Sequence, residues 1–118
     1  MDIQNEIMNI ASEMNRGFLQ LIILTFLDIP SYGYDIIDSL EKIGYKVEEN
    51  TLYPLLRRLE KKEILVSEWR VVDNKPRKYY SISQYGKELR KEIMKIWIIQ
   101  NQILQKLDDG RKENEWKA

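Results

Sequence analysis

Apolar residues recur at helical spacing through the first part of the chain. An otherwise polar N-terminal segment carries a narrow stripe formed by Ile3, Ile7, Ile10 and Met14. A stripe of this width predicts an amphipathic helix that docks onto another surface. Residues 17–28 are apolar nearly all round, which predicts a central, buried helix after it.

Two further helices joined by a tight turn follow. Pro30 and Ser31 are expected to stop the central helix and cap the next one. Gly44 is a residue type favoured at the end of a helix, and Pro54 places the next helix start near Asn50, because proline is tolerated in a first turn. This order predicts a helix-turn-helix. The inner side of its first helix is expected to consist of Tyr34, Ile36, Ile37, Leu40 and Ile43.

The helix from Asn50 has one apolar and one polar side. Leu52, Leu55, Leu56 and Leu59 recur at helical spacing and are expected in the core. Hydroxyl and guanidinium groups on the outer side suit phosphate oxygens and base edges of DNA. With Asn50 at the helix start, the predicted outer contacts are Thr51, Tyr53, Arg57, Arg58 and Lys61.

Some of these contacts have alternatives. Tyr53 is expected to bind a phosphate through its hydroxyl, in preference to stacking on a neighbouring helix. One of Arg57 and Arg58 is expected to face DNA, and the other to pair with Glu60 or Glu63.

The periodicity changes after Lys62. Residues 64–72 and 77–82 are rich in β-forming types and flank a turn-forming segment, residues 73–76, which predicts a hairpin. Tyr79 and Tyr80 are then expected to face opposite sides, and Trp69 to lie in the core or at a hinge. The hairpin residues expected beside the DNA backbone are Lys75, Arg77 and Lys78, with a solvated hairpin as the alternative.

A long helix is predicted from a Ser83 cap to about Leu107, with Gly110 at its end and a frayed polar tail over 111–118. About 25 residues span roughly 37 Å, more than a small DNA-binding body can cover. We therefore expect a homodimer, in which the N-terminal stripe of one chain packs against the long helix of its partner. The expected organisation is a winged helix-turn-helix over 1–82 and a dimerisation helix over 83–110.

Composition narrows the function. The 118 residues suit one domain and contain neither cysteine nor histidine, which removes the usual zinc ligands, thiol nucleophiles and imidazole bases. We expect no enzyme, no metal and no cofactor. Formal net charge is zero, but residues 1–41 carry −6 and residues 42–91 carry +6. This segregation places positive charge on the predicted reading helix and hairpin, as DNA binding requires.

The N-terminus lacks the pattern of a signal peptide, and the longest apolar run, Leu21 to Leu27, is too short to span a bilayer. We expect a cytoplasmic protein without a membrane partner.

These elements and motifs resemble the PadR family of bacterial transcriptional regulators, in particular its short members with a single C-terminal helix. The similarity covers nearly the whole chain. It implies an α+β fold, mainly α with a small hairpin, and a dimeric repressor that releases operator DNA when a small ligand acts. The motifs are Tyr32-Gly33-Tyr34, the segment from Thr51 to Glu60, Ser67-Glu68-Trp69, the segment from Pro76 to Tyr80, and Gly86. One departure is a short wing tip, residues 72–75, without a glycine-rich turn.

Trp97 lies mid-way along the predicted dimerisation helix, and a tryptophan there is similar to that of multidrug-responsive members of the family. A nearby two-fold axis would bring two indoles together to sandwich a planar aromatic effector; a dry, packed interface is the equal alternative. The predicted lining is Ile7, Met8, Ala11, Asn15, Ile93, Ile96, Trp97 and Gln100. The resulting hypothesis is a ligand-responsive repressor on a pseudo-palindromic operator. The alternatives are a winged-helix module that binds proteins without sequence-specific DNA binding and, more remotely, an enzyme with a borrowed cofactor.

Overall fold

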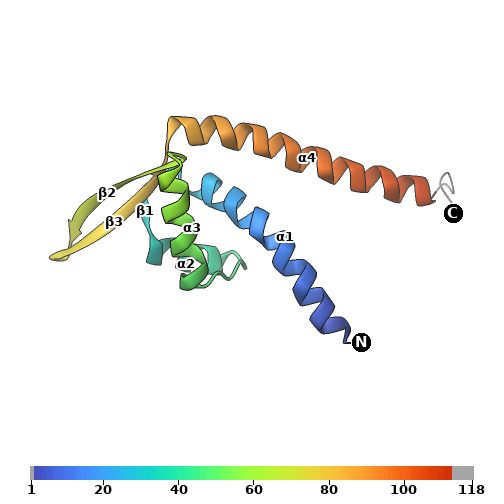
Figure 1. Ribbon diagram of the computed structural model, residues 1–118, viewed down its shortest axis with the longest axis horizontal. Helices are drawn as coiled ribbons and strands as arrows, with labels where there is room; N and C mark the ends of the chain where they lie inside the picture. Colours follow the sequence, from blue (N-terminus) through green and yellow to red (C-terminus); the bar gives the residue numbers. More distant parts are fainter. Residues whose placement is uncertain (1, 113–118) are drawn as a thin grey trace.

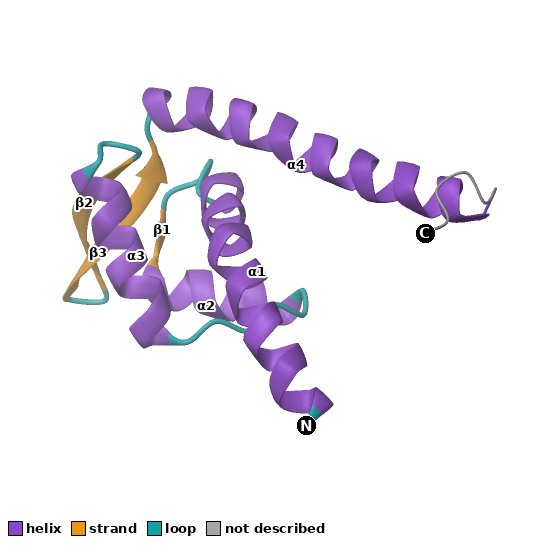
Figure 2. Ribbon diagram, turned by 45° about the vertical axis from the view of Figure 1, so that its right-hand side comes forward, coloured by secondary structure: helices purple, strands orange, loops and turns teal. Residues whose placement is uncertain are grey.

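The computed structural model describes residues 2–112, which form four helices and a three-stranded antiparallel sheet (Figures 1 and 2). The α+β winged helix-turn-helix with a long C-terminal helix is thus confirmed. None of the helices in this range is long and apolar enough to cross a bilayer. In chain order the elements are α1 (Ile3–Phe26), β1 (Ser31–Tyr32), α2 (Gly33–Lys42), α3 (Glu49–Lys61), β2 (Leu65–Val72), β3 (Lys75–Ile82) and α4 (Gln84–Lys112).

Helix α1 is continuous over 24 residues, so the prediction of two helices is wrong. The Asp2 carboxylate caps it by accepting a hydrogen bond from the Gln4 backbone N–H at 2.9 Å. Gly17 lies inside the helix and does not interrupt it. A single glycine in a helix costs only about 1 kcal/mol of stability relative to alanine. The apolar stripe forms its exposed N-terminal half, and buried side chains begin at Leu19.

The chain after α1 forms a short strand where a helix cap was predicted. Ser31 and Tyr32 pair with Tyr80 and Tyr79 of β3, so Ser31 does not cap α2. The N-cap residue of α2 is Tyr32, which makes no side-chain capping bond. Pairing with β3 uses the backbone groups of Ser31 and Tyr32 themselves and holds the chain extended up to the start of α2.

The inner side of α2 is narrower than predicted. Ile36 and Leu40 are buried and Ile37 is half-buried, whereas Tyr34 and Ile43 are 62% and 77% exposed. Tyr34 lies on the side of the helix opposite Ile36, and Ile43 is the C-cap residue, beyond the last helical residue Lys42. Just beyond its end, Gly44 has a φ of +92°, as expected of a residue after a helix C-terminus.

Helix α3 begins at Glu49, one residue before the predicted start. Pro54 therefore lies in its second turn, not its first, and the Asn50 carbonyl has no proline N–H to accept from. The predicted core side is confirmed, because all four leucines, Leu52, Leu55, Leu56 and Leu59, are at most 5% exposed.

The β2–β3 hairpin, residues 65–82, is called the wing. Its two-residue turn consists of Asp73 and Asn74, both with positive φ, which suits the right-handed twist of the strands. Aspartate and asparagine tolerate this conformation, so the wing needs no glycine-rich tip. Lys75 and Pro76, expected in the turn, belong to β3 instead. The central strand of the sheet is β3, because β1 pairs along its other edge.

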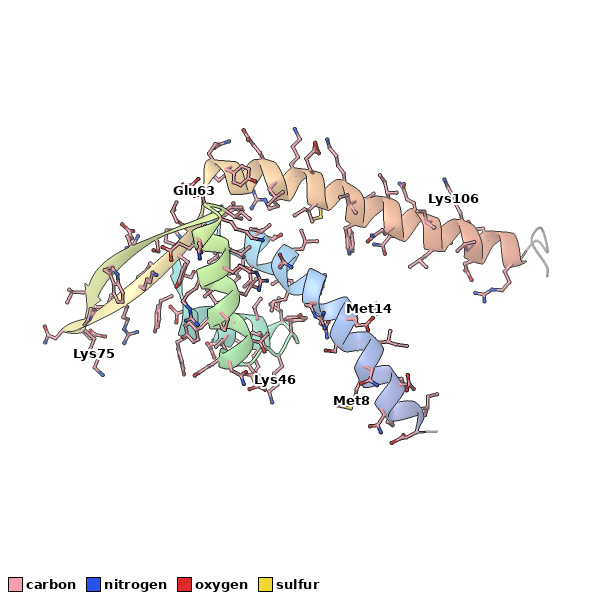
Figure 3. The ribbon with its side chains drawn as sticks, in the orientation of Figure 1. Met8, Met14, Lys46, Glu63, Lys75 and Lys106 are labelled. Atoms are coloured by element: carbon pink, nitrogen blue, oxygen red, sulfur yellow. The ribbon has the colours of Figure 1, made fainter. Side chains whose placement is uncertain are left out.

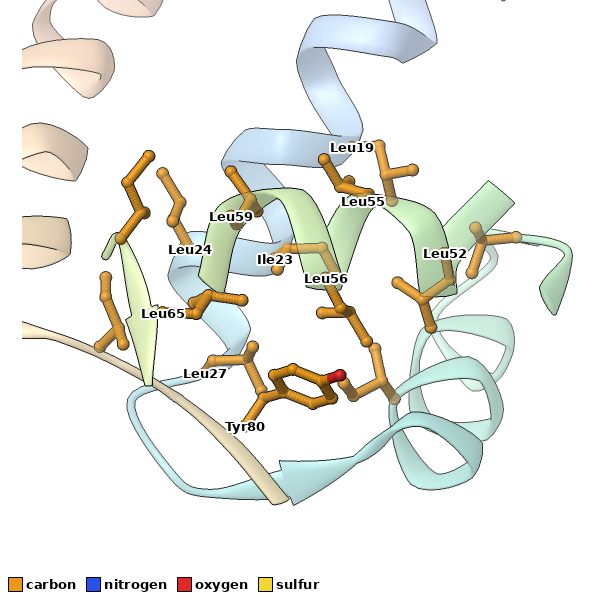
Figure 4. Close-up of a cluster of buried hydrophobic side chains, with 14 of the residues drawn as sticks. Leu19, Ile23, Leu24, Leu27, Leu52, Leu55, Leu56, Leu59, Leu65 and Tyr80 are labelled. Atoms are coloured by element: carbon orange, nitrogen blue, oxygen red, sulfur yellow. The ribbon is translucent and has the colours of Figure 1, made fainter. Parts of the chain in front are cut away.

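The core joins the C-terminal half of α1 to α2, α3 and the base of the wing. Figure 4 shows Ile23 of α1 and Leu27, the residue after α1, near Leu56 of α3, with Tyr80 of β3 beneath them. Tyr80 is buried and Tyr79 only half-buried, which confirms their opposite faces. Trp69 is 68% exposed, so its predicted core position is wrong: it lies on the part of the wing beyond the core.

Helix α4 starts as predicted, because the Ser83 hydroxyl accepts the Gly86 backbone N–H at 2.9 Å. It passes through Gly110 to Lys112, so Gly110 does not end it, and residues 113–118 of the predicted tail lie outside the described residues. The helix is about 43 Å long. Helices α1 and α4 diverge from the sheet toward their free ends (Figures 1 and 2). Near their junction the Arg90 guanidinium donates to the Leu24 carbonyl and the Asp28 carboxylate, at 2.9 and 2.8 Å.

Candidate nucleic-acid interface

The outer side of α3 is exposed and basic. Burying four leucines on one side of the helix turns Arg57 and Arg58 to solvent. Within residues 2–112 neither guanidinium has an ion pair, so the predicted pairing of one of them with Glu60 or Glu63 is wrong. Glu60 binds Lys78 instead. Free guanidinium groups retain all their donors for phosphate or base-edge acceptors. The remaining predicted residues exposed on this side are Asn50, Thr51 and Lys61.

Tyr53 is half-buried, and its ring covers Gly33 at the start of α2. A Cβ atom at Gly33 would lie 2.3 Å from the Tyr53 ring and 2.4 Å from its hydroxyl oxygen, so only glycine fits against the ring as placed. Burial, with a smaller effect from Glu49, raises the pKa of the Tyr53 hydroxyl. The ring thus packs on a neighbouring helix, as the alternative reading of the sequence had it; a phosphate bond from the hydroxyl stays a prediction.

The wing presents two of its predicted contacts on or near the exposed surface. Lys75 is at the tip of the hairpin (Figure 3). Arg77 is half-buried, with its guanidinium 4.6 Å from the centre of the Tyr32 ring and hydrogen-bonded to the Tyr32 hydroxyl. Tyr32 in turn contacts Tyr79, with ring centres 5.5 Å apart. These contacts hold Arg77 by the start of α2 and restrict its orientation.

Lys78, the third predicted wing contact, lies on the opposite face of β3. Its ammonium forms an ion pair with the Glu60 carboxylate at 2.8 Å and lies 5.1 Å from the centre of the Tyr80 ring. Glu60 also accepts a hydrogen bond from the Ser67 hydroxyl. The hydrogen bonds from Lys78 and Ser67 lower the pKa of Glu60, and the bond to Glu60 raises the pKa of Lys78. Sequence reasoning did not foresee this pairing.

A cleft of about 570 Å³ separates α1 from α4 and contains part of the predicted effector site. It brings together Asn15, Ile93, Ile96, Trp97 and Gln100. Trp97 is 42% exposed in this cleft. Sequence reasoning missed six lining residues: Met14, Gly17, Phe18, Leu21, Asn101 and Leu104. All except Leu21 lie within four positions of a predicted lining residue on the same helix.

The other predicted lining residues lie elsewhere. Met8 and Ala11 line a separate depression of about 560 Å³ between α1 and the start of α3, which Asn15 also borders. Ile7 borders neither cavity and is 51% exposed. One chain therefore does not gather the eight residues into a single pore.

The sequence profile of the transcriptional regulator PadR-like family matches residues 22–92, from the buried half of α1 to the start of α4. The chain belongs to the PadR-like family. The crystal structure of a PadR family transcriptional regulator from Eggerthella lenta DSM 2243 is 37% identical and superposes with a TM-score of 0.83, over 89% of this chain and 94% of that one. The family consists of transcriptional regulators, so the predicted function as a DNA-binding regulator, not an enzyme, is confirmed.

Two curated sequences are also similar to this PadR-family chain. Protein X of Lysinibacillus sphaericus, which is uncharacterized, is 35% identical over 86% of this chain and 97% of its own length. The transcriptional regulator Rv3488 of Mycobacterium tuberculosis is 40% identical over 64% of this chain and 71% of its own length.

Proposed function

We propose that this PadR-family regulator is a cytoplasmic homodimeric repressor, which binds a pseudo-palindromic operator and releases it when a planar aromatic molecule binds at the dimer interface. The exposed basic side of α3 beside the wing is the observation that carries the proposal. In a two-fold dimer, each α3 enters a major groove, and the two half-sites lie about one helical turn apart.

The proposed DNA contacts combine groove and backbone recognition. Arg57 and Arg58 have free guanidinium groups suited to bidentate bonds with guanine or phosphate. Lys75 and Arg77 lie on the wing, where they would neutralise phosphates beside the groove. The other proposed contacts are Asn50, Thr51, Tyr53 and Lys61. Lys78 was predicted with them from the sequence, but its ammonium is bound to Glu60.

Exposed apolar surface on α1 and α4 supports the dimer. Ile3 and Met14 are each 70% exposed, and Leu104 is 66% exposed. Exposed apolar side chains that recur along one side of a long helix are typical of a surface that another chain covers. A partner's α4 against the stripe of α1 would cover both.

The cleft beside Trp97 supports an aromatic effector. Its volume of about 570 Å³ suits a small molecule, and its lining is mostly apolar with the amides of Asn15, Gln100 and Asn101. A bound ligand that changed the spacing of α1 and α4 would change the spacing of the two reading helices and so the affinity for DNA.

A gel-shift titration of the purified protein tests this proposal. The DNA is the region upstream of its own gene, and a scrambled fragment of equal length is the control. A planar cationic dye serves as effector probe, with a dye-plus-DNA control and a separate tryptophan-quenching titration of wild type and Trp97→Ala without DNA.

A salt-sensitive shift of the upstream fragment alone, weakened by a dye that quenches wild type but not Trp97→Ala, is the expected result. Equal, weak shifts of both fragments would favour the protein-binding module instead. A specific shift that ignores the dye would retain the repressor and leave Trp97 as interface packing.

A further inference from the structure

The carboxylate of Glu60 connects three secondary-structure elements. It lies in the last turn of α3, and its two oxygens accept from Ser67 of β2 and from Lys78 of β3. The side chains of Glu60 and Lys78 are 31% and 29% exposed, so the pair is partly shielded from water. One side chain of the reading helix thus holds both strands of the wing.

The position of this contact along the wing allows it to affect the orientation of the whole outer part of the hairpin. At the base of the hairpin Leu65 and Ile82 are anchored in the core, at 1% and 7% exposed. The pairing of β1 along β3 ends at Tyr79, and Trp69, which lies opposite Lys78, is 68% exposed. Beyond Lys78 the wing is a two-stranded ribbon, a structure that is marginally rigid by itself. The Glu60 contacts therefore lie where the wing leaves the body of the protein.

We propose that Glu60 is a positioning residue for DNA binding: by holding Lys78 and Ser67, it fixes the angle between the wing and α3, so that both reach the operator together. Lys78 then acts through Glu60 and does not neutralise a phosphate. The inference rests on the proposed function, and it revises the role predicted for Lys78.

The charge of Glu60 and its positioning role predict opposite effects of its removal on the affinity for DNA. An acidic group beside phosphates repels DNA, so neutralising it would strengthen binding if repulsion were its only influence. A positioning role predicts weaker binding instead, because a wing that samples many angles loses freedom when it binds. The sign of the change separates the two.

Fluorescence polarisation with a labelled operator fragment, at several KCl concentrations, measures this sign. The variants are Glu60→Gln, Lys78→Gln, the double variant, and Glu68→Gln as a matched control. Glu68 is also acidic and on the wing, but it pairs with Arg70 of its own strand, so its loss leaves the wing attached to α3. Thermal unfolding of each variant confirms that it is folded at the assay temperature.

We expect Glu60→Gln to bind the operator about tenfold more weakly, as befits the loss of a charge-assisted hydrogen bond. Lys78→Gln should be similar, and the double variant no weaker than either, because one contact is lost in each case. The control should bind as tightly as wild type or more tightly. Equal or tighter binding by Glu60→Gln overturns the proposal. So does a double variant weaker than Glu60→Gln with a salt slope lower by about 1, since Lys78 would then neutralise a phosphate.

A measurement without DNA keeps this test separate from the proposed function. In a Trp97→Phe, Trp116→Phe background, Trp69 is the remaining tryptophan, and its anisotropy decay reports motion of the wing. Glu60→Gln should add a fast component that Glu68→Gln does not. If wild type bound no specific DNA, the proposed function would fail. An unchanged anisotropy decay in Glu60→Gln would contradict the proposal that Glu60 restricts the motion of the wing, even if wild type bound its operator.

Discussion

The orientation of the Arg77 side chain is set by Tyr32, a residue far away in the sequence. Its guanidinium lies against the Tyr32 ring and donates to the Tyr32 hydroxyl. Arg77→Ala should weaken operator binding and lower the slope of log affinity against log salt by about 1, because one phosphate contact is lost. Polarisation titrations at four KCl concentrations measure both quantities. A variant with wild-type affinity and slope would show that Arg77 does not contact DNA.

Tyr32→Phe separates the orientation of Arg77 from its charge. The variant keeps the ring and loses one hydrogen bond, worth about 0.5–1.5 kcal/mol, or about two- to tenfold in affinity. We expect a loss within that range and an unchanged salt slope in the same titrations, because the charge of Arg77 remains. A slope reduced as far as in Arg77→Ala would mean that the tyrosine hydroxyl is required for the phosphate contact itself.

At this scale the sequence predicts which side chains are exposed better than which ones they touch. The helical spacing of the leucines correctly predicted that Arg57 and Arg58 face solvent. The partners of Arg77 and Lys78 lie 45 and 18 positions away, at Tyr32 and Glu60. Such pairs depend on how the wing is oriented against α2 and α3, which local periodicity does not encode.

The start of α4 is held against the chain that precedes the wing. The Ser83 hydroxyl and backbone N–H both donate to the Ile64 carbonyl, and a Cβ at Gly86 would lie 2.3 Å from that same oxygen. Gly86→Ala should therefore lower the free energy of unfolding by about 1–3 kcal/mol, because backbone must move. Thermal or urea unfolding measures the change.

Gly17→Ala is the matched control. Gly17 lies inside α1, and apart from its chain neighbours and the backbone of its own helix no atom of the described residues is within 4 Å of an added Cβ. Alanine there should stabilise the protein by about 0.5–1 kcal/mol through helix propensity alone. If Gly86→Ala were equally stabilising, the close packing of α4 on Ile64 would be contradicted.

The contact between α3 and the wing makes stability depend on pH. Bonds from Lys78 and Ser67 lower the pKa of Glu60, so its contribution is complete above the unfolded value of about 4.3 and is lost as pH falls through the folded pKa. The difference in unfolding free energy between wild type and Glu60→Gln should be constant from pH 7 to about 5 and shrink below about 4. Urea unfolding at several pH values measures it. A difference that grew on acidification would contradict the ion pair.

Elements with strong periodicity were predictable, and elements fixed by their neighbours were not. The four leucines of α3 and the β-rich runs of the wing gave correct elements. The strand Ser31–Tyr32 has two residues and exists because β3 has a free edge, so no local pattern reveals it. The continuity of α1 through Gly17 was missed because burial changes there while the backbone does not.

The molecule measures 64 × 36 × 24 Å along its principal axes. The free ends of α1 and α4 project from its body without packing on each other. Figure 3 shows Lys106 projecting from the side of α4 that is turned away from α1. Leu107 is 49% exposed and lies about one helical turn after Leu104, which is 66% exposed. Leu107→Glu should dissociate the proposed dimer, because a buried, unpaired carboxylate is costly. Lys106→Glu is the control and should leave the dimer intact.

Light scattering after size-exclusion chromatography measures the molar mass of each variant in solution, and therefore whether it is a dimer. We expect wild type and Lys106→Glu near twice the 14.2 kDa mass of the chain, and Leu107→Glu near that mass itself. A wild-type monomer at micromolar concentration would contradict the dimer.

The sequence predicted a last helix too long for one small body, and α4 extends over 29 residues. The dimer that this length suggested stays a prediction. The sequence did not predict the shape of the effector site: in one chain the predicted lining residues are divided between two depressions. Whether a second chain joins them depends on how two copies pack, which the pattern of a single chain does not determine.

Hydroxyl-radical footprinting of the upstream DNA tests most directly the central claim, that two copies of the basic side of α3 and the wing bind one operator. The account predicts two protected backbone regions related by two-fold symmetry, about 34–36 Å apart, and their loss in an Arg57→Ala, Arg58→Ala variant that remains folded. A single protected region, protection without sequence preference, or protection unchanged in that variant would contradict it.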